Sequence, residues 1–129
     1  MQGRILIVED HPTMRGALRL ILESEGFDVE EASDGARALV AIHDAPPDVV
    51  FLDLNIPGTS GAQVLATIKG DPSTADVGVI VITAEGEEGR APAMLLGADA
   101  YLTKPFSPTE LLRTVERALE GSGPTAASP

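Results

Sequence analysis

The stretch 49-VVFLDLNIPGTSG-61 joins an apolar run, a single carboxylate and a loop. The apolar run ends at Asp53, and Pro57 and Gly58 then break the chain. An unbroken apolar run before turn residues is typical of a parallel strand that is covered on both faces. A carboxylate at the end of such a strand is costly unless another group compensates its charge. Asp53 therefore needs a cationic partner elsewhere in the chain.

Five short strand-like runs recur along the 129 residues and are separated by helical patterns. The predicted strands are Arg4–Val8, Asp28–Glu31, Asp48–Leu52, Val77–Ile82 and Asp99–Leu102. Strict alternation of strands and helices predicts an α/β fold, a doubly wound five-stranded parallel sheet with right-handed crossovers and helices on both faces. In such sheets, binding sites lie beyond the carboxyl ends of the strands.

Apolar spacing and capping signals predict the helices between the strands. An apolar stripe runs from Met14 to Leu22, a second helix spans 35–43, a third begins after Ser60, and the last begins after Ser107. The inner face of the last helix is predicted to carry Leu111, Val115 and Ala118, with Leu112 or Leu119.

The fourth helix is predicted to be short, from about Ala91 to Leu96, after a mobile loop. The segment 85–92 holds two glycines and Pro92, and proline is tolerated in the first turn of a helix but not in its interior. At the other end of the chain, 121-GSGPTAASP-129 is small and polar, with nothing to bury. We therefore expect one domain over residues 1–120, followed by a flexible tail or the start of a linker.

Composition excludes several classes of function. The net charge of −11 would repel phosphate backbones, so direct binding of DNA or RNA is not expected. The absence of cysteine excludes disulfides, a thiolate nucleophile and a cysteine-based zinc site. Neither a signal peptide nor an apolar run of the roughly 20 residues needed to cross a bilayer is present, so a cytoplasmic protein is expected.

Polar side chains follow four of the predicted strands. Glu9 and Asp10 follow the first, Asp53 the third, Thr83 the fourth and Lys104 the fifth. A doubly wound fold brings these ends to one edge of the sheet, which would cluster three carboxylates beside an ammonium group and a hydroxyl. Such a cluster needs a cation, and we expect a hard divalent ion with oxygen ligands, Mg²⁺, to meet that need together with Lys104.

These blocks together resemble the receiver domain of two-component response regulators, the fold of the chemotaxis protein CheY. The resemblance covers roughly residues 3–120 and rests on the acid pair 9–10, the block D-L-N-I-P-G-T-S-G from Asp53 to Gly61, V-I-T-A around Thr83, and A-D-A-Y-L-T-K-P-F at 98–106. It implies a sheet with strand order 2-1-3-4-5.

The resemblance also implies roles at the strand ends. Asp53 would accept a phosphoryl group from a sensor histidine kinase or a phosphotransfer protein. Asp10 and Asp53 would ligate Mg²⁺ directly, Glu9 would act through a metal-bound water, and the backbone carbonyl of Asn55 would complete the protein ligands. Mn²⁺ could substitute for Mg²⁺. The metal and Lys104 would stabilise charge on the phosphoryl oxygens.

The resemblance also implies a conformational switch on phosphorylation. Thr83 would turn its hydroxyl toward the phosphoryl group, and Tyr101 would rotate inward, which alters the surface of the fourth helix, fifth strand and fifth helix. That surface would serve an output partner, a tethered output domain or a phosphorylation-dependent homodimer. Asn55 and Glu85 would tune the lifetime of the phosphoryl group, and fairly quick self-dephosphorylation is predicted. The peptide bond Lys104–Pro105 is expected to be cis.

Other functions remain to be weighed against this one. A receiver-like scaffold that works without phosphate is the main alternative. A phosphohydrolase that turns over external phosphoesters is disfavoured, because Asn55 stands where such enzymes carry a second Asp. The chain is therefore expected not to be an enzyme, although it should promote its own phosphorylation and dephosphorylation. His11 invites interpretation as a metal ligand or phosphohistidine, but a loop histidine is more often simply solvated.

Overall fold

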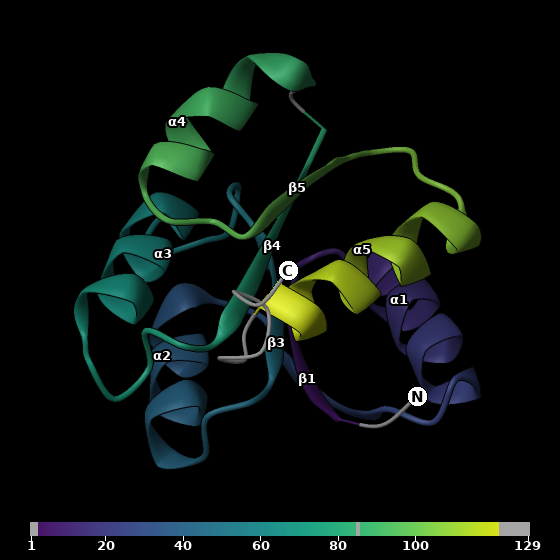
Figure 1. Cartoon of the computed structure of the whole chain (residues 1–129), viewed down its shortest axis with the longest axis horizontal. Coiled ribbons are helices and arrows are strands. Elements are labelled where there is room, and N and C mark those ends of the chain that lie inside the picture. The colour runs from purple at the N-terminus through teal and green to yellow at the C-terminus, as the bar shows by residue number, and fades with distance from the viewer. Residues whose placement is uncertain (1–2, 85, 122–129) are drawn as a thin grey trace.

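The computed structural model describes residues 3–84 and 86–121, in which strands and helices alternate as predicted (Figure 1). The strands are β1 (Arg4–Val8), β2 (Asp28–Ala32), β3 (Val49–Asp53), β4 (Gly78–Thr83) and β5 (Ala100–Thr103). The helices are α1 (Pro12–Ser24), α2 (Gly35–Asp44), α3 (Gly61–Gly70), α4 (Arg90–Leu95) and α5 (Pro108–Gly121), and a 3-10 turn, η1 (Glu87–Gly89), precedes α4.

The five strands form one parallel sheet in the order β2-β1-β3-β4-β5, which confirms the predicted fold class and strand order. Helices α1 and α5 cover one face, and α2, α3 and α4 lie on the other (Figure 1). Each helical crossover brings the next strand back in the same direction. All carboxyl ends therefore meet at one edge of the sheet.

The core consists of two apolar layers, one on each side of the sheet. Strand β3 is buried along its whole length, and its side chains alternate between the layers: Val50 and Leu52 face α2 and α3, whereas Val49 and Phe51 face α1 and α5. Burial on both faces explains the continuous apolar run in its sequence. Helix α5 contributes the predicted residues Leu111, Val115 and Ala118, with Leu112 and Leu119 partly buried beside them.

Predicted capping residues begin two of the helices. The hydroxyl of Ser60 accepts a hydrogen bond from the backbone amide of Gln63 (3.2 Å). In return, the side-chain oxygen of Gln63 accepts a hydrogen bond from the backbone amide of Ser60 (3.3 Å). At α5, the hydroxyl of Ser107 accepts a hydrogen bond from the amide of Glu110 (3.1 Å). Such caps satisfy amide groups that have no partner within the helix. The Ser60 cap also fixes the far end of the loop that follows Asp53.

Helix α4 differs from the prediction at its start. It begins at Arg90 instead of Ala91 and ends at Leu95, and the segment predicted as a mobile loop contains the 3-10 turn η1. Pro92 is the third residue of α4, where its missing N–H would have no intrahelical acceptor, so the helix can begin before it. The mobility of this segment stays a prediction.

Two other expectations concern the ends of the described chain. Helix α5 continues through Gly121, one residue into the predicted tail, and the rest of that tail, 122–129, lies outside the described residues. Within the described residues, we find no helix with the length and apolar character needed to cross a membrane.

Lys69, near the end of α3, ties that helix to the sheet. Its Nζ donates to the carbonyl oxygens of Ala75 (3.1 Å) and Val77 (2.7 Å) and to Oδ2 of Asp99 (2.9 Å). We expect Lys69→Met to lower the free energy of unfolding by about 2 kcal/mol, because it removes a charged donor from the part-buried carbonyl oxygens of Ala75 and Val77. Urea denaturation measures this loss.

Arg37→Met provides the matched control for Lys69→Met. The Arg37 side chain is 78% exposed and pairs with Asp34 at 3.5 Å. Removing such an exposed pair should cost no more than about 0.5 kcal/mol. Equal losses in the two variants would contradict the role assigned to Lys69.

Candidate metal centre at the carboxyl edge of the sheet

The strand ends bring the predicted polar residues into one cluster. Glu9 directly follows β1, Asp53 ends β3 and Thr83 ends β4, and all three are buried. Lys104 follows β5, and its amide donates to the carbonyl oxygen of Thr83 (2.8 Å), which fixes the backbone beside the site. The Lys104–Pro105 bond is cis, as predicted.

Lys104 joins two carboxylates from different strands. Its Nζ lies 2.9 Å from Oδ2 of Asp53 and 2.7 Å from Oε1 of Glu9. Lys104 is the cationic partner that the sequence predicted for Asp53. The direct contact with Glu9 was not foreseen, since Glu9 was expected to act only through a metal-bound water. Glu9 is fully buried, so a direct cationic partner compensates its charge.

The charge environment of Lys104 affects its pKa in two opposite ways. Burial, the largest single influence, lowers the pKa of Lys104. The hydrogen bonds to Glu9 and Asp53 and the charges of these two carboxylates together outweigh burial and raise the pKa above its ordinary value. Lys104 is therefore a permanent cation at neutral pH.

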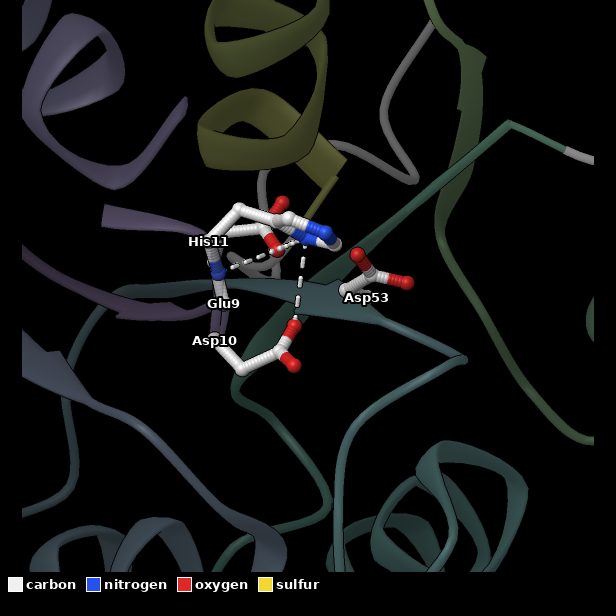
Figure 2. A group of neighbouring side chains, drawn as sticks. All are labelled: Glu9, Asp10, His11 and Asp53. Carbon is white, nitrogen blue, oxygen red and sulfur yellow. Dashed lines mark hydrogen bonds and ion pairs between the residues drawn. The ribbon is translucent and has the colours of Figure 1, made fainter. Parts of the chain in front are cut away.

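The acidic side of the cluster fits a divalent cation. Glu9, Asp10, His11 and Asp53 each offer one ligand atom, and these atoms all lie within 4.8 Å of one another. Figure 2 shows the four side chains converging. Among the described residues, no hydrogen-bond donor satisfies the buried Oδ1 of Asp10. Several carboxylates and an unsatisfied oxygen form the donor set that a hard ion such as Mg²⁺ prefers.

The loop after β3 contributes to the site through its backbone. The amide of Asn55 donates to Oδ1 of Asp53 (2.8 Å), so both oxygens of Asp53 are held, one by this amide and one by Lys104. The carbonyl of Asn55 as a metal ligand stays a prediction, as does the influence of the exposed Asn55 side chain on phosphoryl lifetime. Glu85, the other residue predicted to tune that lifetime, lies outside the described residues.

Tyr101 occupies a buried position next to the segment before α4. Only 4% of the residue is exposed, its hydroxyl donates to the carbonyl oxygen of Gly86, and the guanidinium carbon of Arg90 lies 5.0 Å from the ring centroid. The predicted inward rotation of Tyr101 stays a prediction. Thr83 is also fully buried.

Gly89, one of the two glycines in the segment 85–92, makes room for Tyr101. A Cβ atom added at Gly89 would lie 2.5 Å from the Tyr101 hydroxyl oxygen. We expect Gly89→Ala to displace Tyr101 outward and to cost about 1 kcal/mol through the lost hydrogen bond to Gly86. Tyr101 is the only tyrosine and the chain has no tryptophan, so quenching of its fluorescence by acrylamide reports the displacement directly.

Gly16→Ala is the control for this substitution, because no atom of the described residues lies within 4 Å of a Cβ added there. Quenching in this variant should equal that of the unmodified chain. If Gly89→Ala also left the quenching unchanged, the packing role of Gly89 would be wrong.

His11 is the residue whose place in the cluster sequence reasoning missed. Its side chain is 71% exposed, as a solvated loop histidine would be, yet its Nδ1 lies 3.3 Å from both Oε2 of Glu9 and Oδ1 of Asp10. The available signal was its position directly between an acid pair and Pro12.

Comparisons with known proteins agree with this geometry. A sequence model of the response regulator receiver domain matches residues 5–116. The chain is 40% identical over 121 residues to the phosphate regulon transcriptional regulatory protein PhoB of Pseudomonas aeruginosa, covering 93% of this chain and 53% of that protein. It is 38% identical over 120 residues to the DNA-binding response regulator MtrA of Mycolicibacterium smegmatis, covering 92% of this chain and 51% of that protein. The chain thus spans about half the length of these curated relatives.

Solved structures show the same likeness in three dimensions. A putative response regulator from Chloroflexus aurantiacus superimposes with a TM-score of 0.87 at 32% identity, covering 92% of this chain and 98% of that one. A CheY-like response regulator receiver domain protein from Methanospirillum hungatei gives a TM-score of 0.86 at 28% identity, with 95% and 97% covered. From the strand-end cluster, the sheet order and these matches together, we conclude that the chain belongs to the response regulator receiver domain family.

Proposed function

We propose that the chain is a phosphoacceptor module in which Asp53 receives a phosphoryl group from a sensor histidine kinase or a phosphotransfer protein. The observation that carries the proposal is the placement of Asp53: a buried carboxylate held between the Lys104 ammonium and the acid pair Glu9–Asp10. A cytoplasmic location suits such a partner. The chain would not turn over external substrates, but it would promote its own phosphorylation and dephosphorylation.

The reacting group would be the carboxylate of Asp53. One of its oxygens attacks phosphorus, the bond from phosphorus to the donor's nitrogen breaks, and the freed imidazole of the donor takes up a proton. The Asn55 amide and Lys104 hold the carboxylate in place, and Lys104 lies where it can neutralise charge on the phosphoryl oxygens. The hydroxyl of Thr83, at the end of the neighbouring strand, would hydrogen-bond one of those oxygens.

Mg²⁺ is the cofactor that the oxygen donors of the cluster support best, with Mn²⁺ as a substitute. Asp10, Asp53 and the backbone carbonyl of Asn55 would hold the ion directly, and Glu9 would act through a water molecule. When bound, the ion supplies positive charge that stabilises the phosphoryl oxygens during transfer. The buried, unsatisfied Oδ1 of Asp10 supports this assignment.

The surface formed by α4, β5 and α5 would transmit the phosphorylation signal, and Tyr101 packs there beside Gly86 and Arg90. Phosphorylation would change that surface for an output partner, a tethered output domain or a second copy of the chain. The curated relatives are about twice as long as this chain, and the names of two describe a transcriptional regulator and a DNA-binding regulator. With a net charge of −11, this chain itself would not bind DNA directly.

Incubation with acetyl phosphate, with and without Mg²⁺, followed by intact mass measurement, tests the proposal. We expect a gain of one phosphoryl group that requires the metal and is absent in Asp53→Asn. Asp28→Asn, which replaces an exposed carboxylate on β2 at the edge of the sheet, is the control and should be phosphorylated normally. A gain that survives Asp53→Asn would overturn the proposal and favour a receiver-like scaffold that works without phosphate at this site.

The phosphoryl group on Asp53 is expected to be lost quickly after the donor is removed. Acyl phosphates are labile, and Asn55, two residues after Asp53, is polar and exposed. The decay of the phosphorylated mass with time measures the lifetime. Persistence for many hours would contradict this expectation.

A further inference from the structure

We infer that His11 is an additional ligand of the metal centre and gives it a preference for first-row transition ions such as Co²⁺ over Mg²⁺. The inference rests on the proposed function, because it concerns the same centre. An all-oxygen site suits Mg²⁺, whereas an imidazole ligand favours Co²⁺, Ni²⁺ and Zn²⁺. His11 would therefore turn an oxygen site into one of mixed nitrogen and oxygen ligands.

The local sequence fixes the backbone of His11. Its successor, Pro12, is the first residue of α1, and a residue before proline is restricted to extended conformations. His11 accordingly has φ −80° and ψ 113°, and its amide donates to Oε2 of Glu9 (3.2 Å). It stands at the N-cap position of α1, but within the described residues its side chain makes no capping hydrogen bond there. The ring contacts the acid pair instead, with its Nδ1 3.3 Å from Oε2 of Glu9.

The ring points toward the carboxylates. Figure 2 shows it between Glu9, Asp10 and Asp53. Its Nδ1 lies 3.3 Å from an oxygen of Glu9 and 3.3 Å from an oxygen of Asp10. Two neighbouring ligand atoms, each about 2.1 Å from a shared ion, are roughly 3.0–3.4 Å apart. The 3.3 Å between Nδ1 of His11 and Oδ1 of Asp10 therefore suits two ligands of one ion with little rearrangement.

Two further observations favour a ligand over a packing residue. The side chain of His11 is 71% exposed, so it fills no part of the core. The Oδ1 of Asp10 that faces it is buried and lacks a hydrogen-bond donor among the described residues. A bound ion between the two would satisfy both groups.

The competing explanation is that His11 acts only as a cation that neutralises Glu9 and Asp10. The two explanations predict opposite effects. Removing a positive charge from the cluster would strengthen the binding of every divalent ion alike. Removing a nitrogen ligand would weaken Co²⁺ selectively, because Mg²⁺ gains little from imidazole.

Isothermal titration of the full chain with Co²⁺ and, separately, with Mg²⁺ distinguishes them. The titrations are made at mildly alkaline pH, because an imidazole must be neutral to ligate a metal ion. We expect His11→Gln to weaken Co²⁺ binding roughly tenfold or more and to change Mg²⁺ binding less than about twofold. The visible absorption bands of bound Co²⁺ should shift in the same variant.

His43→Gln is the matched control, because His43 is the only other histidine and lies on α2, beside a hollow lined by α2 and α3. It should bind both ions like the unmodified chain. If His11→Gln changed the binding of the two ions equally, or if His43→Gln weakened Co²⁺ binding as much as His11→Gln does, this inference would be wrong. The proposed function would be unaffected by either result. Failure of the unmodified chain to bind either ion would overturn this inference together with the metal requirement of the proposed function.

Discussion

Gly61→Ala is expected to lower the free energy of unfolding by about 3 kcal/mol, at the upper end of the cost of overpacking a buried site. An added Cβ at Gly61 would lie 2.5 Å from Cα of Leu54 and 2.8 Å from the carbonyl oxygen of Asp53. These are backbone atoms, which cannot swing aside as the end of a side chain can. The backbone that carries Asp53 would have to move, so phosphorylation from acetyl phosphate should fall as well. Urea denaturation and the rate of phosphorylation measure the two effects.

The same helix offers a control for this substitution. Gly70 is the last residue of α3, and a Cβ added there would have no atom within 4 Å in the part of the chain that the structure describes. Because alanine has a higher helix propensity than glycine, Gly70→Ala should be neutral or stabilise the protein by up to about 1 kcal/mol. If Gly61→Ala proved as stable and as readily phosphorylated as Gly70→Ala, the tight approach of α3 to the loop after β3 would be unimportant.

Lys104→Met is expected to destabilise the protein by about 3 kcal/mol when Mg²⁺ is absent, because it leaves the buried carboxylates of Glu9 and Asp53 without their shared cation. Added Mg²⁺ should restore part of this loss by supplying charge at the same place. In the double variant Asp53→Asn, Lys104→Met, the carboxylate of Asp53 is already neutralised, so only Glu9 is left unpaired. The loss of unfolding free energy caused by Lys104→Met should therefore be smaller in the Asp53→Asn background. Urea denaturation of the four proteins gives the coupling energy.

The pH dependence of the unmodified chain follows from the raised pKa of Lys104. A group whose pKa is higher in the folded than in the unfolded state binds protons more tightly when folded. Its contribution to stability is complete below the unfolded pKa of about 10.4 and is lost as pH rises through the folded pKa. Stability should therefore fall at alkaline pH in the unmodified chain, and this component should be missing in Lys104→Met. Similar stability of the two proteins without Mg²⁺ would contradict the pairing.

The fold was predictable because its signals are local. Continuous apolar runs such as 49–52 mark strands covered on both faces, and the alternation with helices leaves few arrangements of the sheet. The clustering of Asp10, Asp53 and Lys104 was predictable for a related reason, since residues that follow parallel strands share one edge. Capping at Ser60 and Ser107 could likewise be read from neighbouring residues.

Contacts that depend on side-chain direction were not predictable. Whether Lys104 reaches Asp53 alone or also Glu9 depends on rotamers and loop geometry between residues distant in the chain. The need for glycine at position 89 is visible only once the Tyr101 hydroxyl is seen beside it. The orientation of His11 toward the acid pair depends on the backbone conformation of the turn before α1, which the sequence alone does not specify.

Measuring how Asp53 phosphorylation depends on Mg²⁺, alongside direct Mg²⁺ binding, tests the central claim that the strand ends form one metal-assisted phosphoacceptor site. We predict that the rate of phosphorylation from acetyl phosphate rises with Mg²⁺ over the same concentration range in which titration calorimetry shows the ion binding, and that Asp10→Asn shifts both curves together. A rate that is independent of Mg²⁺, or one whose dependence Asp10→Asn leaves unchanged, would contradict the account.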